Sequence, residues 1–280
     1  MSGTLFVVAT PIGNLEDLTP RARQTLADVD LIAAEDTRHT RRLLSHFGIK
    51  TPLLALHDHN EKALAGKLVD DISSGKSIAL VSDAGTPLIS DPGYRLVQAA
   101  HRERIPVSPI PGASALTAAL SVAGLPTDQF CFEGFLPAKK KARCDALSLL
   151  ANETRTMVFY ESVHRMRECL EDMIAVFGAA RPAFIGRELT KLHEQTTHAT
   201  LEKLSQRLGD EDIVPKGEFV IIVAGAVQAG SSQIDIDRLL VELSDKLPGK
   251  EVAKILARAT GEKRNALYQR LLELSKGAPE

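Results

Sequence analysis

The chain has 280 residues, of which 44% are hydrophobic and 25% charged, and its formal net charge is −2. This length favours two domains over a single core, and the composition is that of an ordinary globular protein. The near-neutral charge excludes a chain that is basic throughout, and no apolar run approaches the roughly 18 residues of a membrane span. The N-terminus lacks the layout of a signal peptide, so we expect no membrane attachment and a cytoplasmic location.

The first half of the chain alternates strand and helix signals. Short apolar runs predict strands at 5–9, 31–34, 53–56, 77–81 and 106–110. Amphipathic periodicity and capping residues predict helices at 20–29, 37–47, 60–74 and 113–123, with one more opened by Asp91 as N-cap and Pro92 at the first helical position. This alternation indicates an α/β domain with a mainly parallel sheet covered on both faces, which we place at 1–115.

A second, smaller α/β domain is predicted at 116–228. Its expected strands lie at 130–135, 156–160, 183–186 and 219–223, and its expected helices at 138–150, 163–177 and 201–208. The small, polar segment 226–233 is typical of a linker. A helical, basic tail at 235–280 follows, with breaks at Pro248-Gly249 and Gly261; from Lys246 to Lys276 it carries eight Lys or Arg against three Glu.

The densest cluster of special residues lies at 81–93, directly after the expected strand 77–81. It holds two Gly, two Pro, two Asp and three hydroxyl residues. Open α/β folds bind ligands at the carboxyl ends of their strands, so this segment is a candidate binding loop. Ala84 and Gly85 allow a ligand to approach the backbone, and Asp83 offers an acceptor. The alternative is a tight turn between a strand and a helix.

Two further loops follow strands in the same way. The first could form the side of a crevice opposite the candidate binding loop, and its sequence is Thr10-Pro11-Ile12-Gly13-Asn14-Leu15. The second, Pro111-Gly112-Ala113-Ser114, exposes backbone N–H groups that suit an anion. On its own, the first of these loops is more typical of a plain turn than of a site, and the second is equally well explained by ordinary capping. The chain has no Gly-x-Gly and no P-loop motif, which excludes the Rossmann dinucleotide fingerprint and the P-loop NTPases.

Charged residues end three of the expected strands. Glu35-Asp36-Thr37-Arg38 is readable either as a polar site or as a helix cap with solvated charges. Arg38, Arg41 and Arg42 fall on neighbouring helix positions and could grip phosphates. The segments 160–165 and 186–191 carry mixed charge where a cleft between the domains would lie, and residues 139–143 form a second basic cluster.

A metal site is not indicated. Cys131, Cys144 and Cys169 are widely spaced and form no Cys-x-x-Cys pair. The segment 57–60, His-Asp-His-Asn, is weak evidence for a metal and is better read as a capped turn. We therefore expect neither a disulfide framework nor a bound metal.

Taken together, six segments resemble the tetrapyrrole methylase superfamily, and within it the ribosomal RNA branch. They occur in family order at 8–15, 34–38, 81–93, 109–114, 159–162 and 186–191. Porphyrinoid-modifying relatives usually carry Gly-Asp-Pro in the main loop, whereas this chain has Asp83-Ala84-Gly85-Thr86-Pro87. The resemblance implies two α/β domains of the tetrapyrrole methylase type with a cleft between them, a small helical appendage and a homodimer.

The resemblance also implies a reaction. The methyl donor would be S-adenosylmethionine, leaving S-adenosylhomocysteine, and the acceptor the ribose 2′-hydroxyl of cytidine 1402 of 16S ribosomal RNA, in the decoding region of the small ribosomal subunit. Glu35 or Asp36 would act as base, with Arg38 orienting the ribose or a phosphate. The cofactor-binding residues carried over are Ile12, Gly13, Ser82, Asp83, Ala84, Gly85, Thr86, Ala113, Ser114, Tyr160 and Arg187.

Two other functions stay open on the sequence. One is the same chemistry on a porphyrinoid of the precorrin type, and the other is a non-enzymatic ribosome-assembly factor that binds RNA. The basic tail either docks ribosomal RNA, is a solvated appendage, or packs on a second copy of the chain. Its candidate contacts are Lys250, Lys254, Arg258, Lys263, Arg264 and Arg270.

Overall fold

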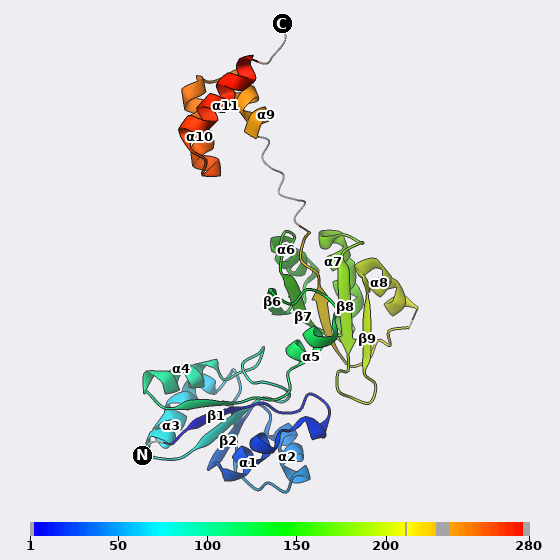
Figure 1. The fold of residues 1–280 in the computed structure, drawn as a ribbon. Coiled ribbons are helices and arrows are strands. Elements are labelled where there is room, and N and C mark those ends of the chain that lie inside the picture. The colour runs from blue at the N-terminus through cyan, green and yellow to red at the C-terminus, as the bar shows by residue number, and fades with distance from the viewer. Residues whose placement is uncertain (1–2, 211, 228–235, 277–280) are drawn as a thin grey trace. The chain divides into compact units, whose positions relative to one another are not determined.

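The structure is a computed structural model that describes residues 3–210, 212–227 and 236–276. The chain separates into two compact units, Met1–Ala226 and Val227–Glu280. The first unit contains two five-stranded sheets and the second a group of helices (Figure 1). The boundary that we place at 115/116, between the two sheets, stays a prediction. Most of the predicted linker, 226–233, lies outside the described residues.

The first sheet is parallel throughout. Its strands are β1 (Leu5–Val8), β2 (Leu31–Ala34), β3 (Leu53–Ala55), β4 (Ile78–Val81) and β5 (Val107–Ile110). They lie in the order β3-β2-β4-β1-β5. Because all five run the same way, the loops after β1, β2 and β4 meet at one edge of the sheet, as the sequence predicts.

Helices cover both faces of this sheet. Side chains alternate along each strand, so one set packs with α1 (Pro20–Asp28) and α2 (Thr37–His46), and the other with α3 (Glu61–Ser73) and α4 (Tyr94–Arg102). A short 3-10 turn, η1 (Leu15–Asp17), follows the first loop. The predicted mainly parallel sheet with two covered faces is confirmed.

The start of α4 differs from the prediction. The helix is preceded by Gly93 (φ +123°), and Asp91 does not cap it. Glu61, the buried first residue of α3, takes that place: its Oε1 accepts hydrogen bonds from the backbone N–H groups of Arg95 (2.7 Å) and Leu96 (3.0 Å). The positive φ of Gly93 turns the chain just before the helix, which leaves Asp91 outside it.

The second sheet is mixed, in the order β6-β7-β10-β8-β9. Its strands are β6 (Phe130–Phe135), β7 (Thr156–Ser162), β8 (Pro182–Arg187), β9 (Gln195–Thr200) and β10 (Glu218–Val223). β6 pairs with β7 in parallel, with a register shift before Gly134, and the other pairs are antiparallel. β9 was not predicted, because its sequence Gln-Thr-Thr-His-Ala-Thr has no apolar alternation.

Three helices cover one face of the second sheet. They are α6 (Lys140–Leu149), α7 (Met166–Phe177), which follows the short turn η2 (Val163–Arg165), and α8 (Leu201–Gly209). On α6, Arg143 is fully buried, and its Nε lies 2.7 Å from Oδ2 of Asp172. The basic cluster predicted at 139–143 therefore contributes one of its cations to the interior rather than to the surface.

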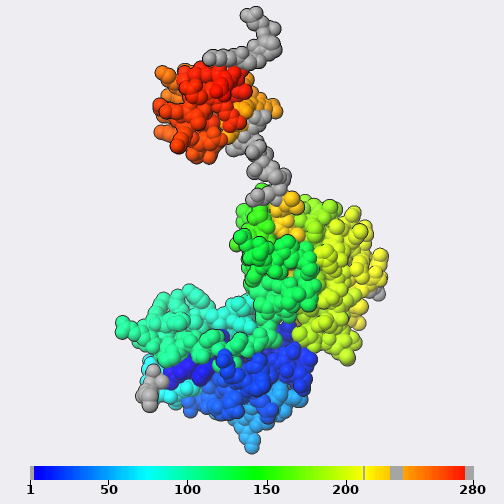
Figure 2. Space-filling view, in the orientation of Figure 1, coloured from blue at the N-terminus to red at the C-terminus, as the bar shows by residue number. Residues whose placement is uncertain are grey.

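The other face of the second sheet joins the two halves of the first unit. There α5 (Ala115–Val122) packs on the sheet together with Ile12 from the loop after β1. In Figure 2, the half that contains the second sheet, in green and yellow, contacts the half that contains the first sheet, in blue and cyan. The carboxyl edge of the first sheet consequently faces residues of the second.

The described part of the second unit, 236–276, consists of three helices, in agreement with the predicted helical appendage. They are α9 (Ile236–Ser244), α10 (Gly249–Thr260) and α11 (Arg264–Lys276), and they share a core that includes Leu240, Val252 and Leu267. Pro248 precedes α10, and Gly261 ends it in the left-handed region (φ +78°). Among the described helices of the whole chain, none has both the length and the apolarity needed to cross a membrane.

Candidate active site

The two loops that follow β1 and β4 are joined through their backbones. The N–H of Thr10 donates to the carbonyl of Gly85 (2.8 Å), and the N–H of Gly85 donates to the carbonyl of Thr10 (3.0 Å). The buried Thr10 hydroxyl also lies 3.4 Å from the Ser82 carbonyl. Gly85 has φ +81°, a conformation that favours glycine. The first predicted loop therefore holds the second in place.

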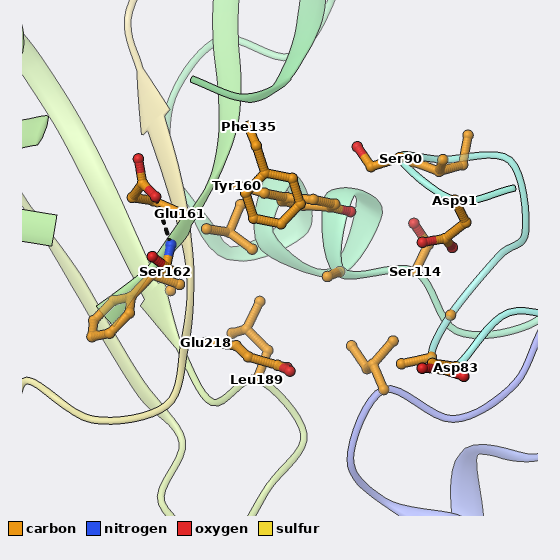
Figure 3. Close-up of a pocket in the computed structure, with 18 of the residues that line it drawn as sticks. Asp83, Ser90, Asp91, Ser114, Phe135, Tyr160, Glu161, Ser162, Leu189 and Glu218 are labelled. Carbon is orange, nitrogen blue, oxygen red and sulfur yellow. Dashed lines mark hydrogen bonds between the residues drawn. The ribbon is translucent and has the colours of Figure 1, made fainter. Parts of the chain in front are cut away.

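These loops border a cavity of about 510 Å³ between the two halves of the first unit. One wall comes from the loop after β4 and the start of α5, and the opposite wall from β6, β7 and β10. Figure 3 shows Phe135 and Tyr160 on one side, facing Asp91, Ser114 and Asp83 on the other. A volume of this size suits a small organic ligand.

The wall formed by the second sheet is mainly apolar and aromatic. The Tyr160 ring makes edge contacts with Phe132 (4.9 Å between centroids) and Phe135 (5.6 Å). Leu189 and Val220 add apolar surface to this side of the cavity, and Glu161 and Glu218 also line it. Such a wall suits the flat, apolar part of a ligand.

The opposite wall carries three carboxylates, those of Glu35, Asp83 and Asp91. Glu35 and Asp83 lie at neighbouring strand ends: the Asp83 N–H donates to Glu35 Oε2 (3.4 Å), and the Asp36 N–H donates to Asp83 Oδ1 (3.0 Å). Burial raises the pKa of Glu35. Burial also raises the pKa of Asp91 to about 6; a hydrogen bond with Ser82 lowers it, while the charges of Glu35 and Asp83 raise it further. This wall favours a cationic ligand.

Asp36 and Arg38 have a different environment. Asp36 is the N-cap of α2, accepting a hydrogen bond from the Arg38 N–H (2.8 Å), and its Oδ2 lies 2.7 Å from Arg38 Nη2. Hydrogen bonding with Arg38 holds the pKa of Asp36 well below its usual range. The Arg38 side chain is 85% exposed. Of the two readings of this segment, helix capping is observed for Asp36.

The structure brings most of the predicted site residues together. The 510 Å³ cavity is lined by Ile12, Glu35, Asp83, Ala84, Gly85, Thr86, Ser114 and Tyr160. The Ala113 carbonyl accepts a hydrogen bond from the Thr86 hydroxyl (3.1 Å) behind this lining. Gly13 and Ser82 line a second, adjoining cavity.

Arg187 is buried and engaged with backbone. Its guanidinium donates to the carbonyls of Lys216 (2.6 Å) and His193 (2.8 Å), which fixes the segments beside β8. The segment after β8 also contains Glu188 (φ +49°) and Thr190 (φ +67°). Strained backbone of this kind often marks a ligand-binding loop.

Several cavity residues escaped the sequence reasoning. Asp91 was read as a helix cap, and Ser90 (φ +70°) shows its strain only in the fold. Gly217 directly precedes β10, and Phe219 and Val220 lie at its start, where nothing in the sequence marks a site. The candidate binding loop 81–93 contains Ser90 and Asp91, and the mixed-charge segments 160–165 and 186–191 also contribute residues to the lining.

The described residues include no group of three or more His, Cys, Asp or Glu side chains placed to hold a metal ion. In the segment 57–60, the His57 and His59 rings lie 5.9 Å apart, edge to face. The Asn60 side chain accepts from the His57 N–H (2.9 Å), which closes the turn before α3, but it does not cap the helix.

Comparison with known proteins identifies the family. Residues 4–205 match the family model of tetrapyrrole (corrin/porphyrin) methylases, and residues 230–275 match that of the RsmI C-terminal HTH domain. A crystal structure of uroporphyrin-III C-methyltransferase from Thermus thermophilus, complexed with S-adenyl homocysteine, has a similar fold. It covers 79% of this chain and 97% of its own, with a TM-score of 0.53 and 18% identity.

Two relatives resemble the chain over nearly its whole length. Ribosomal RNA small subunit methyltransferase I of Xylella fastidiosa is 55% identical over 267 residues, which cover 95% of this chain and 98% of the relative. The protein of the same name from Pasteurella multocida is 51% identical over 275 residues, or 98% of each chain. With these matches, and with the two sheets and the cavity between them, the chain belongs to the tetrapyrrole methylase family.

Proposed function

We propose that this protein is an S-adenosylmethionine-dependent methyltransferase that modifies the ribose 2′-hydroxyl of cytidine 1402 in the 16S ribosomal RNA of the small ribosomal subunit. The observation that carries the proposal is the identity of about half the residues, over 95% or more of the chain, with relatives named ribosomal RNA small subunit methyltransferase I. The loop sequence Asp83-Ala84-Gly85-Thr86-Pro87, in place of the Gly-Asp-Pro of porphyrinoid-modifying relatives, also supports an RNA acceptor.

The residues of the 510 Å³ cavity fit the methyl donor. S-adenosylmethionine supplies an activated methyl group on a sulfonium and also carries an ammonium and an adenine. The carboxylates of Glu35, Asp83 and Asp91 suit its cationic part, and the wall around Tyr160 suits its adenine. At Gly85, a Cβ would lie only 3.2 Å from Ile12 Cγ2, so the backbone there is closely packed beside the ligand space.

We assign the donor site to the residues expected from the sequence. Those that line the cavity would contact the donor directly, and Ala113 and Arg187 would support it by fixing the loops beside it. Gly13 and Ser82 line the adjoining cavity and would lie beside the place where donor and acceptor meet.

For the base we keep Glu35 and Asp36 as candidates, and the geometry favours Glu35. A base needs a carboxylate near the acceptor with a pKa that approaches the working pH. Glu35 lines the donor cavity and accepts a hydrogen bond from the N–H of Asp83 (3.4 Å), a residue that borders both cavities. Burial raises the pKa of Glu35, whereas hydrogen bonding with Arg38 lowers the pKa of Asp36. Glu35 would accept the hydroxyl proton, and Arg38 would orient a neighbouring phosphate.

Conservative amide substitutions separate these roles. With saturating donor, Glu35→Gln should lower kcat by about 100-fold or more, because general base catalysis contributes factors of this order. Asp36→Asn should have a smaller effect, which reflects the start of α2 rather than proton transfer. Near-normal kcat in both variants would remove this pair from the mechanism.

The function is tested directly with labelled S-adenosylmethionine. Incubation with small ribosomal subunits should place the label on the 2′-oxygen of cytidine 1402, as mapped by nuclease digestion and mass spectrometry. Label on a free porphyrinoid instead would favour the alternative acceptor. Binding to subunits without any transfer would indicate an assembly factor.

We further propose that the protein acts as a homodimer in the cytoplasm. The family resemblance supports the dimer, and the ribosomal acceptor supports the location. Sedimentation equilibrium at micromolar concentration should give twice the 30.3 kDa chain mass.

A further inference from the structure

A second cavity adjoins the donor cavity at the carboxyl edge of the first sheet. Its volume is about 300 Å³, and it shares Ile12, Asp83, Ala84 and Glu218 with the donor cavity. The rest of its wall comes mainly from the loop after β1 and from α2, including His39 and Arg42, and Lys191 also lines it. Because the two cavities meet at their shared residues, a molecule in the second cavity would lie next to the donor.

The exposed face of α2 is unusually basic. Arg38, Arg41, Arg42 and Ser45 follow one another at helical spacing (i, i+3, i+4, i+7) and line an open depression together with His46. The helix sequence Thr-Arg-His-Thr-Arg-Arg-Leu-Leu-Ser-His contains no acidic residue. We call the three arginines the α2 arginine stripe.

Two arginines of the α2 arginine stripe have no carboxylate partner. Arg38 pairs with Asp36, but no ion pair in the described part of the chain includes Arg41 or Arg42. Elsewhere in the first unit, Arg143 pairs with Asp172, and Lys191 with Glu188 and Glu218. Adjacent like charges without counter-ions repel each other, and a polyanion relieves that repulsion.

Arg42 links the stripe to the second cavity, because it lines both. We infer that one strand of the acceptor RNA runs along α2 with its phosphates on the α2 arginine stripe, so that the target nucleotide enters the second cavity. This inference rests on the proposed function and specifies where the acceptor of that reaction binds.

The chemistry of the two cavities supports this division. Phosphates are repelled by Glu35 and Asp91, which line the donor cavity and not the second one, and attracted by Arg41 and Arg42, so the RNA backbone stays on the α2 side. A cavity of about 300 Å³ has room for a single nucleoside rather than for a base pair. The acceptor must then present an unstacked nucleotide, which is how sequence-specific RNA recognition usually proceeds.

Salt-dependent binding tests the stripe. The dissociation constant for small ribosomal subunits is measured between 50 and 300 mM KCl for the full-length wild type and for Arg41→Ala/Arg42→Ala. The loss of two phosphate contacts should weaken binding at least tenfold at the lowest salt and reduce the slope of log K against log salt by about 1.4. Arg41→Lys/Arg42→Lys should retain most of the slope, because it keeps both charges.

A matched control lies on the opposite face of the sheet. Lys62 and Lys67 of α3 are exposed, and Lys62→Ala/Lys67→Ala also removes two charges. This variant should bind like the wild type. All variants should bind S-adenosylmethionine normally by calorimetry, which shows that the fold is intact. Equal affinity and slope for wild type and Arg41→Ala/Arg42→Ala would overturn the inference.

Photocrosslinking tests the path into the second cavity. With p-benzoylphenylalanine in place of His39, the crosslink should map to the methylated nucleotide or its immediate neighbours. The same group in place of Lys67 should give none there. A His39 crosslink confined to distant RNA would overturn the assignment of the cavity. Neither binding nor crosslinking requires methyl transfer, so failure of the proposed reaction would be seen separately.

Discussion

At the residue scale, the most informative side chain is Asp91. The sequence presents it as a helix cap beside a proline, but the fold turns it to the cavity wall with Glu35 and Asp83. Burial raises the pKa of Asp91, and the neighbouring charges of Glu35 and Asp83 raise it further. Such an arrangement persists in a protein when function requires it, and here it suits a cationic donor.

The titration of Asp91 gives a prediction about stability. The pKa of Asp91 in the folded protein is about 6, against 3.8 for an unperturbed aspartate, so the folded state holds this proton more tightly than the unfolded state. The resulting stabilisation is complete below pH 4 and is lost as the pH rises through 6. In Asp91→Asn, the free energy of unfolding in urea should therefore fall less between pH 4 and pH 7 than in the wild type.

The exposed Asp70 of α3 provides the control, since Asp70→Asn changes the same group outside the cavity. Its profile should follow that of the wild type. Parallel profiles for Asp91→Asn and the wild type would show that Asp91 titrates normally.

At the element scale, α4 shows how one helix depends on another. Its first N–H groups have no local cap and are bound instead by Glu61, which begins α3. The two helices also pack together on the same face of the first sheet. The end of the donor loop is thereby fixed from α3, a distant segment of the chain.

We expect Glu61→Ala to lower the free energy of unfolding by about 3 kcal/mol, because the buried N–H of Leu96 and the part-buried N–H of Arg95 lose a charged acceptor. Glu61→Gln keeps an oxygen acceptor at the same place and should cost about 1 kcal/mol. Urea denaturation at pH 7 measures both. A loss below about 0.5 kcal/mol in Glu61→Ala would mean that water replaces the carboxylate.

Elements whose local sequence agrees with their environment were predictable. Apolar runs predicted β1, β2 and β4, and N-cap residues with apolar stripes predicted α1 and α2. Together they predicted the alternation of strands and helices along the chain and the edge of the sheet at which its loops meet. β9 was not predictable, because it is polar and pairs only through its backbone. The prediction for the start of α4 was wrong because Glu61, which binds the first N–H groups of the helix, lies more than 30 residues away in the sequence.

The same distinction applies to the candidate site. Loops rich in Gly, Pro and Asp could be identified, and they supply one wall of the donor cavity. The residues of β10 could not, because ordinary residues such as Phe219 and Val220 become site residues only through the sheet order.

At the scale of the whole molecule, the chain combines a unit that holds the donor cavity and the second cavity with a helical unit whose segment 246–276 carries more Lys and Arg than Glu. The second unit ends α10 at Gly261, and α11 follows after a short turn. Lys263 and Arg264 are exposed at that turn. Short turns containing glycine join the two helices of helix-turn-helix motifs, and the first turn of the second helix commonly contacts nucleic acid.

We therefore propose that the second unit docks ribosomal RNA, and that Lys263→Ala/Arg264→Ala in the full chain weakens binding to small subunits. The slope of log K against log salt should again become shallower, by about 1.4 for two contacts. The Lys62→Ala/Lys67→Ala variant serves as the control, because it also loses two positive charges. An unchanged dissociation constant and slope would indicate that the second unit has another role.

The strands at the borders of the two sheets have a consequence for solubility at high concentration. An edge strand with unpaired backbone groups is a template for aggregation. Here β3 has only three residues, β5 contains Pro109, β6 is irregular before Gly134, and β9 is almost wholly polar. Each edge thus carries a feature that discourages pairing between molecules, and the protein can expose two open sheets without assembling into fibres.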